Sequence, residues 1–185
     1  MRVRIRSMRV RDALMAFDQF LFAEGLEFEA VVIGAAALVI MEVVSRETMD
    51  VDFLDPKISP AILDAADRFR RARPEFRLDA HWINNGPESL VRDLPTEWRE
   101  RTRLIFQGQA LVLHTLSRHD LLCTKLFAYC DRGDDLADCV ALQPTPEELR
   151  ECVSWVIARD ANPLWPEHVA RQFKILSMRL GHANA

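Results

Sequence analysis

Residues 31–54, VVIGAAALVIMEVVSRETMDVDFL, constrain the fold more than any other stretch of the chain. The pattern predicts a short apolar strand, a turn at Gly34, a short buried helix, and a second strand that carries Asp50 and Asp52. Successive side chains of a strand point to opposite faces, so the two carboxylates share one face and the apolar side chains share the other. Two acids near a glycine turn are therefore the first candidate for a chemical site.

Hydrophobic periodicity and helix-capping residues place the other elements. Ser59 is an N-cap before Pro60 at the first helical position, and Ser117 with Asp120 resembles a capping box. We expect helices over 10–24, 35–44, 60–72, 117–130, 134–142, 146–160 and 165–180, and strands over 28–33, 49–54, 104–106 and 110–114. Residues 75–100 lack a clear period, and we expect them to form a loop over the site.

The order of these elements predicts the α+β class. Strands and helices alternate through the first two thirds of the chain, whereas the last third is helical. A chain of 185 residues is long enough for one core with a small helical addition. We expect residues 1–116 to form the core and residues 117–185 to form a helical region packed on it in one compact unit.

Charge and composition narrow the class of protein. The net charge of -4 gives no overall basic field for nucleic acid, and no apolar run approaches the ~20 residues that cross a membrane. No segment resembles a signal peptide. Cys123, Cys130, Cys139 and Cys152 form no C-x-x-C pair and lie in apolar helical patterns, so we expect small buried residues in a reducing compartment. A cytoplasmic protein without a membrane partner is expected.

The acidic pair and the glycine turn each allow two interpretations. Asp50 and Asp52 supply the hard oxygen ligands that Mg²⁺ prefers, but acids also alternate along solvated edge strands. Gly34 lets a phosphate approach the backbone at the start of a helix, but a glycine there also permits close packing of helix against strand.

A lone cation in the long helix is the third feature. Lys125 is the only charged residue in residues 121–130, and it invites an anionic partner, which is either an acid or a phosphate. Arg132 follows, and then Asp135 and Asp138 at i, i+3 spacing on one helix face.

Three motifs in order resemble the nucleotidyltransferase fold. They are R-x-T-x-D-x-D at residues 46–52, D-L-L-x-x-K-L at 120–126 and R-x-x-D-x-x-D at 132–138. The resemblance covers about residues 28–142 and is to the bacterial branch that includes abortive-infection-type toxin nucleotidyltransferases and related domains of unassigned function. It implies a small mixed sheet flanked by helices, with a helical C-terminal part.

The resemblance also implies an activity and a site. The implied reaction is the Mg²⁺-dependent transfer of a nucleoside monophosphate from an NTP to a hydroxyl on RNA, a protein or a small molecule. The implied roles are metal binding by Asp50 and Asp52, nucleotide binding by Gly34, Ala35, Arg46, Thr48 and Lys125, and acid or base chemistry by Asp138 or Asp135 with Arg132 as ion-pair partner. Arg132 and Asp135 alternatively only staple a helix turn.

Two departures from the family pattern favour an alternative function. Ala35 stands where a second glycine or a serine is usual, and residues 104–106 and 111–113 lack the third carboxylate that many nucleotidyltransferases carry. Asp79 is the only plausible substitute. The alternative is a binding or regulatory module with weakened catalysis, such as a toxin–antitoxin component with a cognate protein partner. A metal-dependent hydrolase that uses the same aspartates is a third interpretation.

Overall fold

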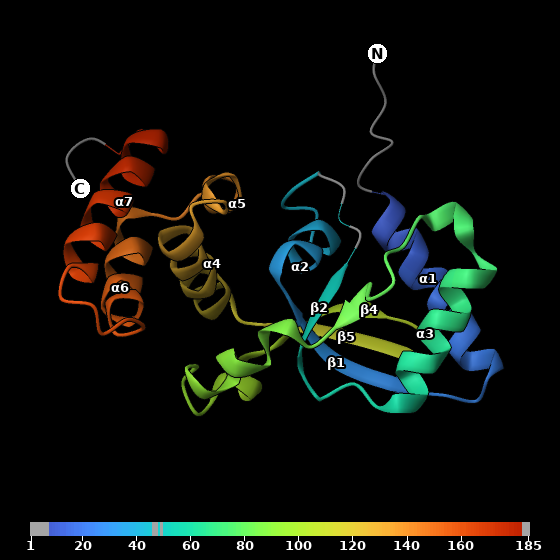
Figure 1. Cartoon of the computed structure of the whole chain (residues 1–185). Coiled ribbons are helices and arrows are strands. Elements are labelled where there is room, and N and C mark those ends of the chain that lie inside the picture. The colour runs from blue at the N-terminus through green and yellow to red at the C-terminus, as the bar shows by residue number, and fades with distance from the viewer. Residues whose placement is uncertain (1–7, 46–47, 49, 183–185) are drawn as a thin grey trace, which may run out of the picture. The chain divides into compact units, whose positions relative to one another are not determined.

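The described residues form a five-stranded sheet with its own helices and a C-terminal group of helices (Figure 1). The computed structural model describes residues 8–45, 48 and 50–182. Contacts divide the chain into two units, residues 1–116 and 117–185. The expected packing of the helical region on the core stays a prediction. None of the helices in the described ranges has the length and hydrophobicity of a membrane span.

The N-terminal unit alternates helices, strands and short 3₁₀ turns. Its elements, in chain order, are α1 (Met8–Ala23), β1 (Phe28–Ile33), α2 (Gly34–Ile40), β2 (Val51–Asp55), α3 (Pro60–Ala72), η1 (Pro74–Phe76), β3 (Ile83–Asn84), η2 (Gly86–Arg92), η3 (Trp98–Arg101), β4 (Arg103–Gln107) and β5 (Leu111–Thr115). The predicted strand over 28–33 is confirmed as β1. The strand predicted over 104–106 lies within β4, and the strand predicted over 110–114 is observed as β5, shifted by one residue.

The sheet is mixed, with the strand order β3-β2-β1-β5-β4. The central strand β1 runs parallel to β5 and antiparallel to β2. The outer strands β3 and β4 pair parallel with β2 and antiparallel with β5, respectively. The chain therefore has the predicted α+β class, with a small mixed sheet flanked by helices.

Helices α1, α2 and α3 contribute to one hydrophobic core with the sheet. Alternate β1 residues Phe28, Ala30 and Val32 face this core. Helices α1 and α3 lie side by side (Figure 1), and the ring centroids of Phe17 and Phe69 are 5.2 Å apart. This packing fixes the sheet whose strand β2 carries Asp52.

A buried acid ties the first helix to the far side of the sheet. Asp18 on α1 is buried, and its Oδ1 accepts hydrogen bonds from the backbone N–H groups of Ala110 and Leu111, each at 2.8 Å. A Cβ atom at Gly108 would lie 2.1 Å from the same oxygen, so the turn between β4 and β5 requires glycine there. Asp18 is thus a structural carboxylate.

The structure departs from the predicted elements in three places. The helix expected over 35–44 ends at Ile40, and Glu42 has a left-handed φ of 61°. Residues 43 and 44 are β-branched valines, which are weak helix formers. The strand expected over 49–54 is present as β2 and starts at Val51, and the first predicted residue, Met49, lies outside the described residues. The expected loop over 75–100 contains three 3₁₀ segments and the two-residue strand β3, which only its pairing with β2 defines.

The C-terminal unit consists of helices in its described part. They are α4 (Arg118–Arg132), α5 (Leu136–Leu142), α6 (Pro146–Ile157) and α7 (Trp165–Arg179). Each predicted helix in this region is confirmed to within three residues at either end. Helix α4 packs against the other three, and α6 packs against α7.

The two serines act as N-caps, as the sequence predicts. Ser59 accepts a hydrogen bond from the Ile62 N–H at the start of α3, and Ser117 accepts one from the Asp120 N–H at the start of α4. At the other end of α4, Gly133 has a φ of 82°, which ends the helix in the left-handed conformation. The ends of α4 are therefore encoded locally.

Candidate functional site

Gly34 and Asp52 are brought together by the pairing of β1 with β2. Ile33 is the register partner of Asp52, and Gly34 follows it with a φ of 74°. A Cβ atom at Gly34 would lie 2.9 Å from Oδ2 of Asp52. The glycine turn and the half-buried carboxylate are thus in direct contact, as a site that combines them would require.

Asp50 lies beside this strand rather than within it. The residue is exposed and immediately precedes β2. Its Oδ1 accepts a hydrogen bond from the Thr48 hydroxyl at 2.9 Å, and the same hydroxyl lies 3.1 Å from the Asp50 carbonyl oxygen. Thr48 therefore orients the Asp50 carboxylate. Arg46, another predicted nucleotide ligand, lies outside the described residues.

The donor set fits Mg²⁺. Asp50 and Asp52 offer hard carboxylate oxygens, and one is exposed while the other is half-buried. Mg²⁺ is commonly bound by one or two carboxylates, with waters and substrate phosphates as its other ligands. These two residues could hold such an ion and leave the rest of its coordination shell to a nucleotide.

An amide stands next to Asp52 on the neighbouring strand. Asn84 of β3 is the register partner of Asp52, and its Oδ1 accepts a hydrogen bond from the Gly86 N–H at 2.7 Å. Strands β4 and β5 carry no carboxylate. Asp79, the proposed substitute for a third acid, is exposed in the segment that precedes β3. On β3, the residue paired with Asp52 thus offers an amide oxygen in place of a third carboxylate.

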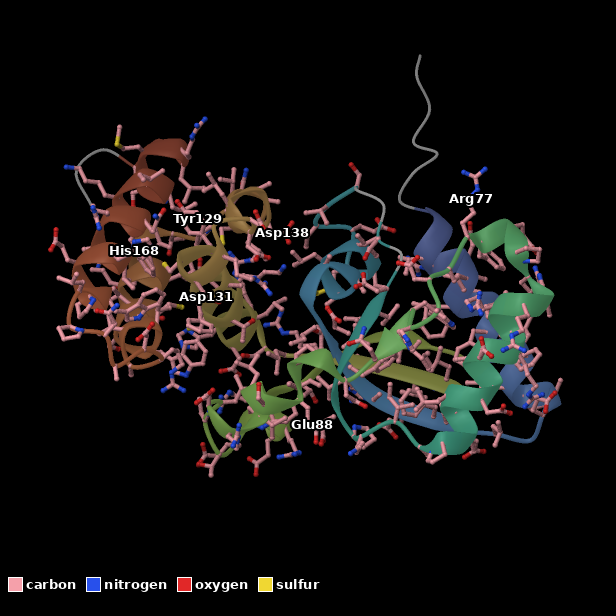
Figure 2. The ribbon with its side chains drawn as sticks, in the orientation of Figure 1. Arg77, Glu88, Tyr129, Asp131, Asp138 and His168 are labelled. Atoms are coloured by element: carbon pink, nitrogen blue, oxygen red, sulfur yellow. The ribbon has the colours of Figure 1, made fainter. Side chains whose placement is uncertain are left out.

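A second cluster of predicted residues lies within the helical unit. The Lys125 ammonium group donates hydrogen bonds to Oδ1 of Asp135 and Oδ2 of Asp138, both at 2.7 Å. The exposed fractions of the three side chains are 6%, 9% and 2%, respectively. Figure 2 shows Asp138 on α5. The sequence predicts either an acid or a phosphate as the partner of Lys125, and the structure shows two acids.

Electrostatics stabilise the charged form of this cluster. Burial opposes ionisation of Asp135, but the hydrogen bonds and positive charges of Lys125 and Arg132 outweigh it and lower the pKa of this carboxyl. Arg132 pairs with Asp135 at 3.0 Å, and this i, i+3 ion pair is the structural alternative that the sequence allows for these two residues. The lysine of the D-L-L-x-x-K-L motif and the two acids of the R-x-x-D-x-x-D motif therefore form one ion cluster, which joins α4 to α5.

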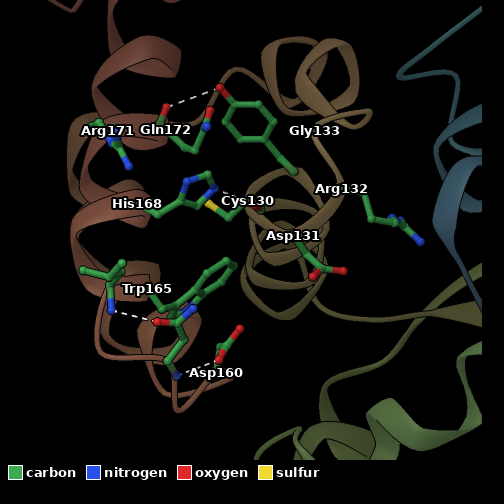
Figure 3. Close-up of a pocket in the computed structure, with 12 residues that line it drawn as sticks. Cys130, Asp131, Arg132, Gly133, Asp160, Trp165, His168, Arg171 and Gln172 are labelled. Carbon is green, nitrogen blue, oxygen red and sulfur yellow. Dashed lines mark hydrogen bonds between the residues drawn. The ribbon is translucent and has the colours of Figure 1, made fainter.

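Arg132 also borders a cavity of about 560 Å³ in the helical unit (Figure 3). Its wall includes Asp160, Arg171 and the stacked rings of Trp165 and His168, whose centroids are 5.5 Å apart. The Arg132 side chain points away from these residues, and it is 63% exposed. The cavity is not lined by Lys125, Asp135 or Asp138.

Comparisons with known proteins give one match. Residues 12–143 match the model of a family described as "Nucleotidyltransferase of unknown function (DUF6036)". Comparisons with curated proteins and with solved structures give no match. The matched segment includes both the contact between Gly34 and Asp52 and the cluster around Lys125.

Proposed function

Because the chain belongs to this nucleotidyltransferase family, we propose that it transfers a nucleoside monophosphate from an NTP to a hydroxyl acceptor with the help of Mg²⁺. The acceptor classes in this proposal are RNA, protein and small molecules. The family establishes the general class of the chain, and the metal, the substrate and the residue roles are parts of the proposal.

The observation that carries the proposal is the contact between Gly34 and Asp52. A side chain at Gly34 would meet the Asp52 carboxylate at 2.9 Å, so glycine keeps open the space in which this carboxylate meets the turn after β1. An acid that lies against a glycine turn can hold a cation where a phosphate approaches the backbone. Strand β2 lies between β3 and β1, so Asp52 is not an acid on an exposed edge strand.

Asp50 and Asp52 would hold the Mg²⁺ ion, and Thr48 would fix the orientation of Asp50 through the 2.9 Å hydrogen bond. When bound, Mg²⁺ neutralises phosphate charge and orients the phosphates for displacement. In the reaction, the acceptor oxygen bonds to the α-phosphorus, the bond to the β-phosphate oxygen breaks, and pyrophosphate leaves. The hydroxyl proton leaves to solvent or to a base.

We assign a structural role to the cluster of Lys125, Asp135 and Asp138. A general base must lie within hydrogen-bond reach of the proton that it removes, but Asp138 is 2% exposed and already accepts a bond from Lys125. Lys125 would have to give up a bond at 2.7 Å to bind a phosphate. The roles of Lys125 in phosphate binding and of Asp138 in proton transfer stay predictions, which a Lys125 variant tests.

The test is a transfer assay with NTPs labelled at the α-phosphate, Mg²⁺, and three acceptor pools: the protein itself, total RNA and a mixture of small hydroxyl compounds. We expect label in one pool. Asp50→Asn and Asp52→Asn should each reduce the transfer at least ~100-fold, because each removes a charged ligand oxygen. Chelation of Mg²⁺ should abolish the transfer.

Asp64→Asn is the matched control. Asp64 is an exposed acid on α3 whose partner is the surface residue Arg68. This variant should transfer label at the parent rate. The proposal fails if the parent labels no pool and NTP with Mg²⁺ leaves its melting temperature unchanged, or if the Asp52 variant is as active as the parent.

An alternative proposal is a binding or regulatory module in which catalysis is weakened, such as a component of a bacterial toxin–antitoxin pair. Two observations favour it: Asn84 rather than an acid pairs with Asp52, and Ala35 follows Gly34. Calorimetry distinguishes the two functions, because the module would bind NTP, or a protein partner, without transfer. Asn84→Asp should then increase transfer if the missing acid limits catalysis.

A further inference from the structure

Two cysteines and a histidine, none of which has a role in the proposed transfer reaction, meet between helices α4 and α6. His119 and Cys123 lie one turn apart on α4, and Cys152 lies on α6. The imidazole nitrogen and the two sulfur atoms all lie within 4.8 Å of one another. Among the described residues, this is the one group of three or more His, Cys, Asp or Glu side chains with donor atoms so close together.

The separations suit a tetrahedral metal ion. With Zn–S near 2.3 Å and Zn–N near 2.0–2.1 Å, a tetrahedral angle places the sulfur and nitrogen ligands about 3.6 Å apart and two sulfurs about 3.8 Å apart. Sγ of Cys123 lies 3.6 Å from Nε2 of His119. Since no pair exceeds 4.8 Å, closure of the group around an ion requires movements of only about 1 Å.

A carboxylate lies on the other side of the imidazole. Nδ1 of His119 is 3.8 Å from Oε2 of Glu151, the residue before Cys152 on α6. Metal-bound histidines commonly present their second ring nitrogen to a carboxylate, which fixes the ring and raises its basicity. His119 thus has one nitrogen toward the thiols and the other toward an acid.

Access and burial also suit an ion. Cys123 and Cys152 are buried, whereas the His119 side chain is 48% exposed. An ion can therefore enter from the solvent side past the imidazole and reach two thiols that are shielded from water. Soft thiolate ligands select Zn²⁺ and related thiophilic cations over Mg²⁺.

We propose that His119, Cys123 and Cys152 bind one thiophilic divalent cation of the Zn²⁺ class, with a water molecule as the fourth ligand and Glu151 as the partner of the histidine. Binding forms two metal–sulfur bonds and one metal–nitrogen bond, and the two thiol protons pass to solvent. The ion joins α4 to α6 and stabilises the helical unit.

The other two cysteines show how this pair differs from ordinary buried thiols. The prediction that all four are buried is confirmed. Burial raises the pKa of Cys130 and that of Cys139 to about 12 each. Cys123, by contrast, has a ring nitrogen beside its sulfur, since its Sγ lies 3.6 Å from Nε2 of His119. In the sequence, the H-x-x-x-C spacing of one helical turn indicates two of the three ligands, His119 and Cys123.

The experiment is a titration of the reduced full chain with Co²⁺ and Zn²⁺. We expect one Co²⁺ per chain, with a thiolate-to-cobalt charge-transfer band and the d–d intensity of a tetrahedral site, and displacement of Co²⁺ by Zn²⁺. Zn²⁺ should raise the melting temperature of the parent. Mg²⁺ at the same concentration should neither displace Co²⁺ nor change its spectrum.

Variants assign the ligands. Cys123→Ser, Cys152→Ser and His119→Ala should each weaken Co²⁺ binding at least about 100-fold, and Glu151→Gln should weaken it about 10–100-fold. Cys130→Ser is the matched control, because it also removes a buried thiol from α4 but should leave affinity within about twofold. Since His119 is exposed, its variant keeps the test valid if a cysteine variant does not fold.

The proposal is overturned if the parent gives no charge-transfer band, if the band survives in both Cys123→Ser and Cys152→Ser, or if Cys130→Ser weakens Co²⁺ binding as much as these variants do. Binding by the unfolded chain is detected by circular dichroism on the same samples, and a band seen only there also overturns it. The outcome is independent of NTP transfer, since the spectra and the melting temperature are read without nucleotide.

Discussion

Two separate effects oppose a side chain at Gly34: its positive φ and the contact of a new Cβ atom with Asp52. Gly34→Ala should lower the free energy of unfolding by about 1–2 kcal/mol because of its positive φ, and by a further amount of about 1 kcal/mol because the new Cβ displaces Asp52. Gly25→Ala is the control, since Gly25 has a φ of 67° with no atom within 4 Å of its Cβ position. Urea denaturation measures both.

The same pair tests the contact itself. In an Asp52→Ala background, Gly34→Ala should lose its excess cost over Gly25→Ala, because the clashing carboxylate is gone. If Gly34→Ala and Gly25→Ala cost the same in the parent, the carboxylate does not occupy the turn. The proposed metal site would then lose the observation that carries it.

Lys125 is a lone charge in its stretch of the sequence, and in the structure it lies in a buried ion cluster. Lys125→Met removes the buried cation that contacts both Asp135 and Asp138, so it should lower the free energy of unfolding by about 3–5 kcal/mol. Arg132→Met, which removes a largely exposed cation, should cost at most about 1 kcal/mol. Denaturation curves measure both. A Lys125→Met protein of parent stability with NTP affinity lowered tenfold would instead support the predicted phosphate contact.

At the scale of elements, the start of α6 is held by a capping box. The Glu148 N–H donates to Oγ1 of Thr145 at 3.1 Å, and the Thr145 N–H donates to the Glu148 carboxylate at 2.9 Å. Thr145→Ala should destabilise the helical unit by about 1 kcal/mol and speed amide exchange in α6. Thr96→Ala, which changes an exposed threonine outside any helix start, should have little effect on α6; unchanged exchange in both variants would contradict the prediction.

Local sequence signals predicted where most helices and strands lie, but not which strands and residues pair with one another. Ser59, Ser117 and Gly133 mark helix ends through bonds and dihedral angles that involve only neighbouring residues, so the sequence reveals them. The strand β3 has two residues and no period of its own, and its existence depends on pairing with β2. For the same reason, Asn84 could not be recognised as the neighbour of Asp52.

The site shows the same division between local and distant information. The spacing of Asp50 and Asp52 and the lone Lys125 could be read from the sequence. The partner of Lys125 could not, because a phosphate and two carboxylates satisfy an ammonium group equally well. Cys152 likewise shows no relation to His119 until α4 and α6 pack together.

For the whole molecule, the buried ion cluster predicts sensitivity to acid. The pKa of Asp135 is lowered in the folded chain, so its contribution to stability is complete above the unfolded pKa of 3.8 and is lost as pH falls through the lower folded value. The free energy of unfolding should therefore decrease as pH falls below about 4. Urea denaturation at a series of pH values measures this slope.

Asp135→Asn provides the comparison for that slope. The variant should be less stable than the parent at pH 7, and the difference between them should shrink as pH falls below about 4, because the parent then loses the charge that the variant lacks. A constant difference across this range would show that Asp135 does not contribute through its ionised form. Tryptophan fluorescence from Trp155 and Trp165 reports on the unit concerned.

The parallel pairing of β1 with β5 has a consequence for the chain during its synthesis. Phe28 pairs with Leu111, so one side of the central strand has no partner until the ribosome has added the whole intervening segment. At ordinary rates of translation this interval is on the order of ten seconds. During that time the nascent chain presents an apolar strand edge of the kind that pairs with other strands, and chaperones would protect it until Thr115 emerges.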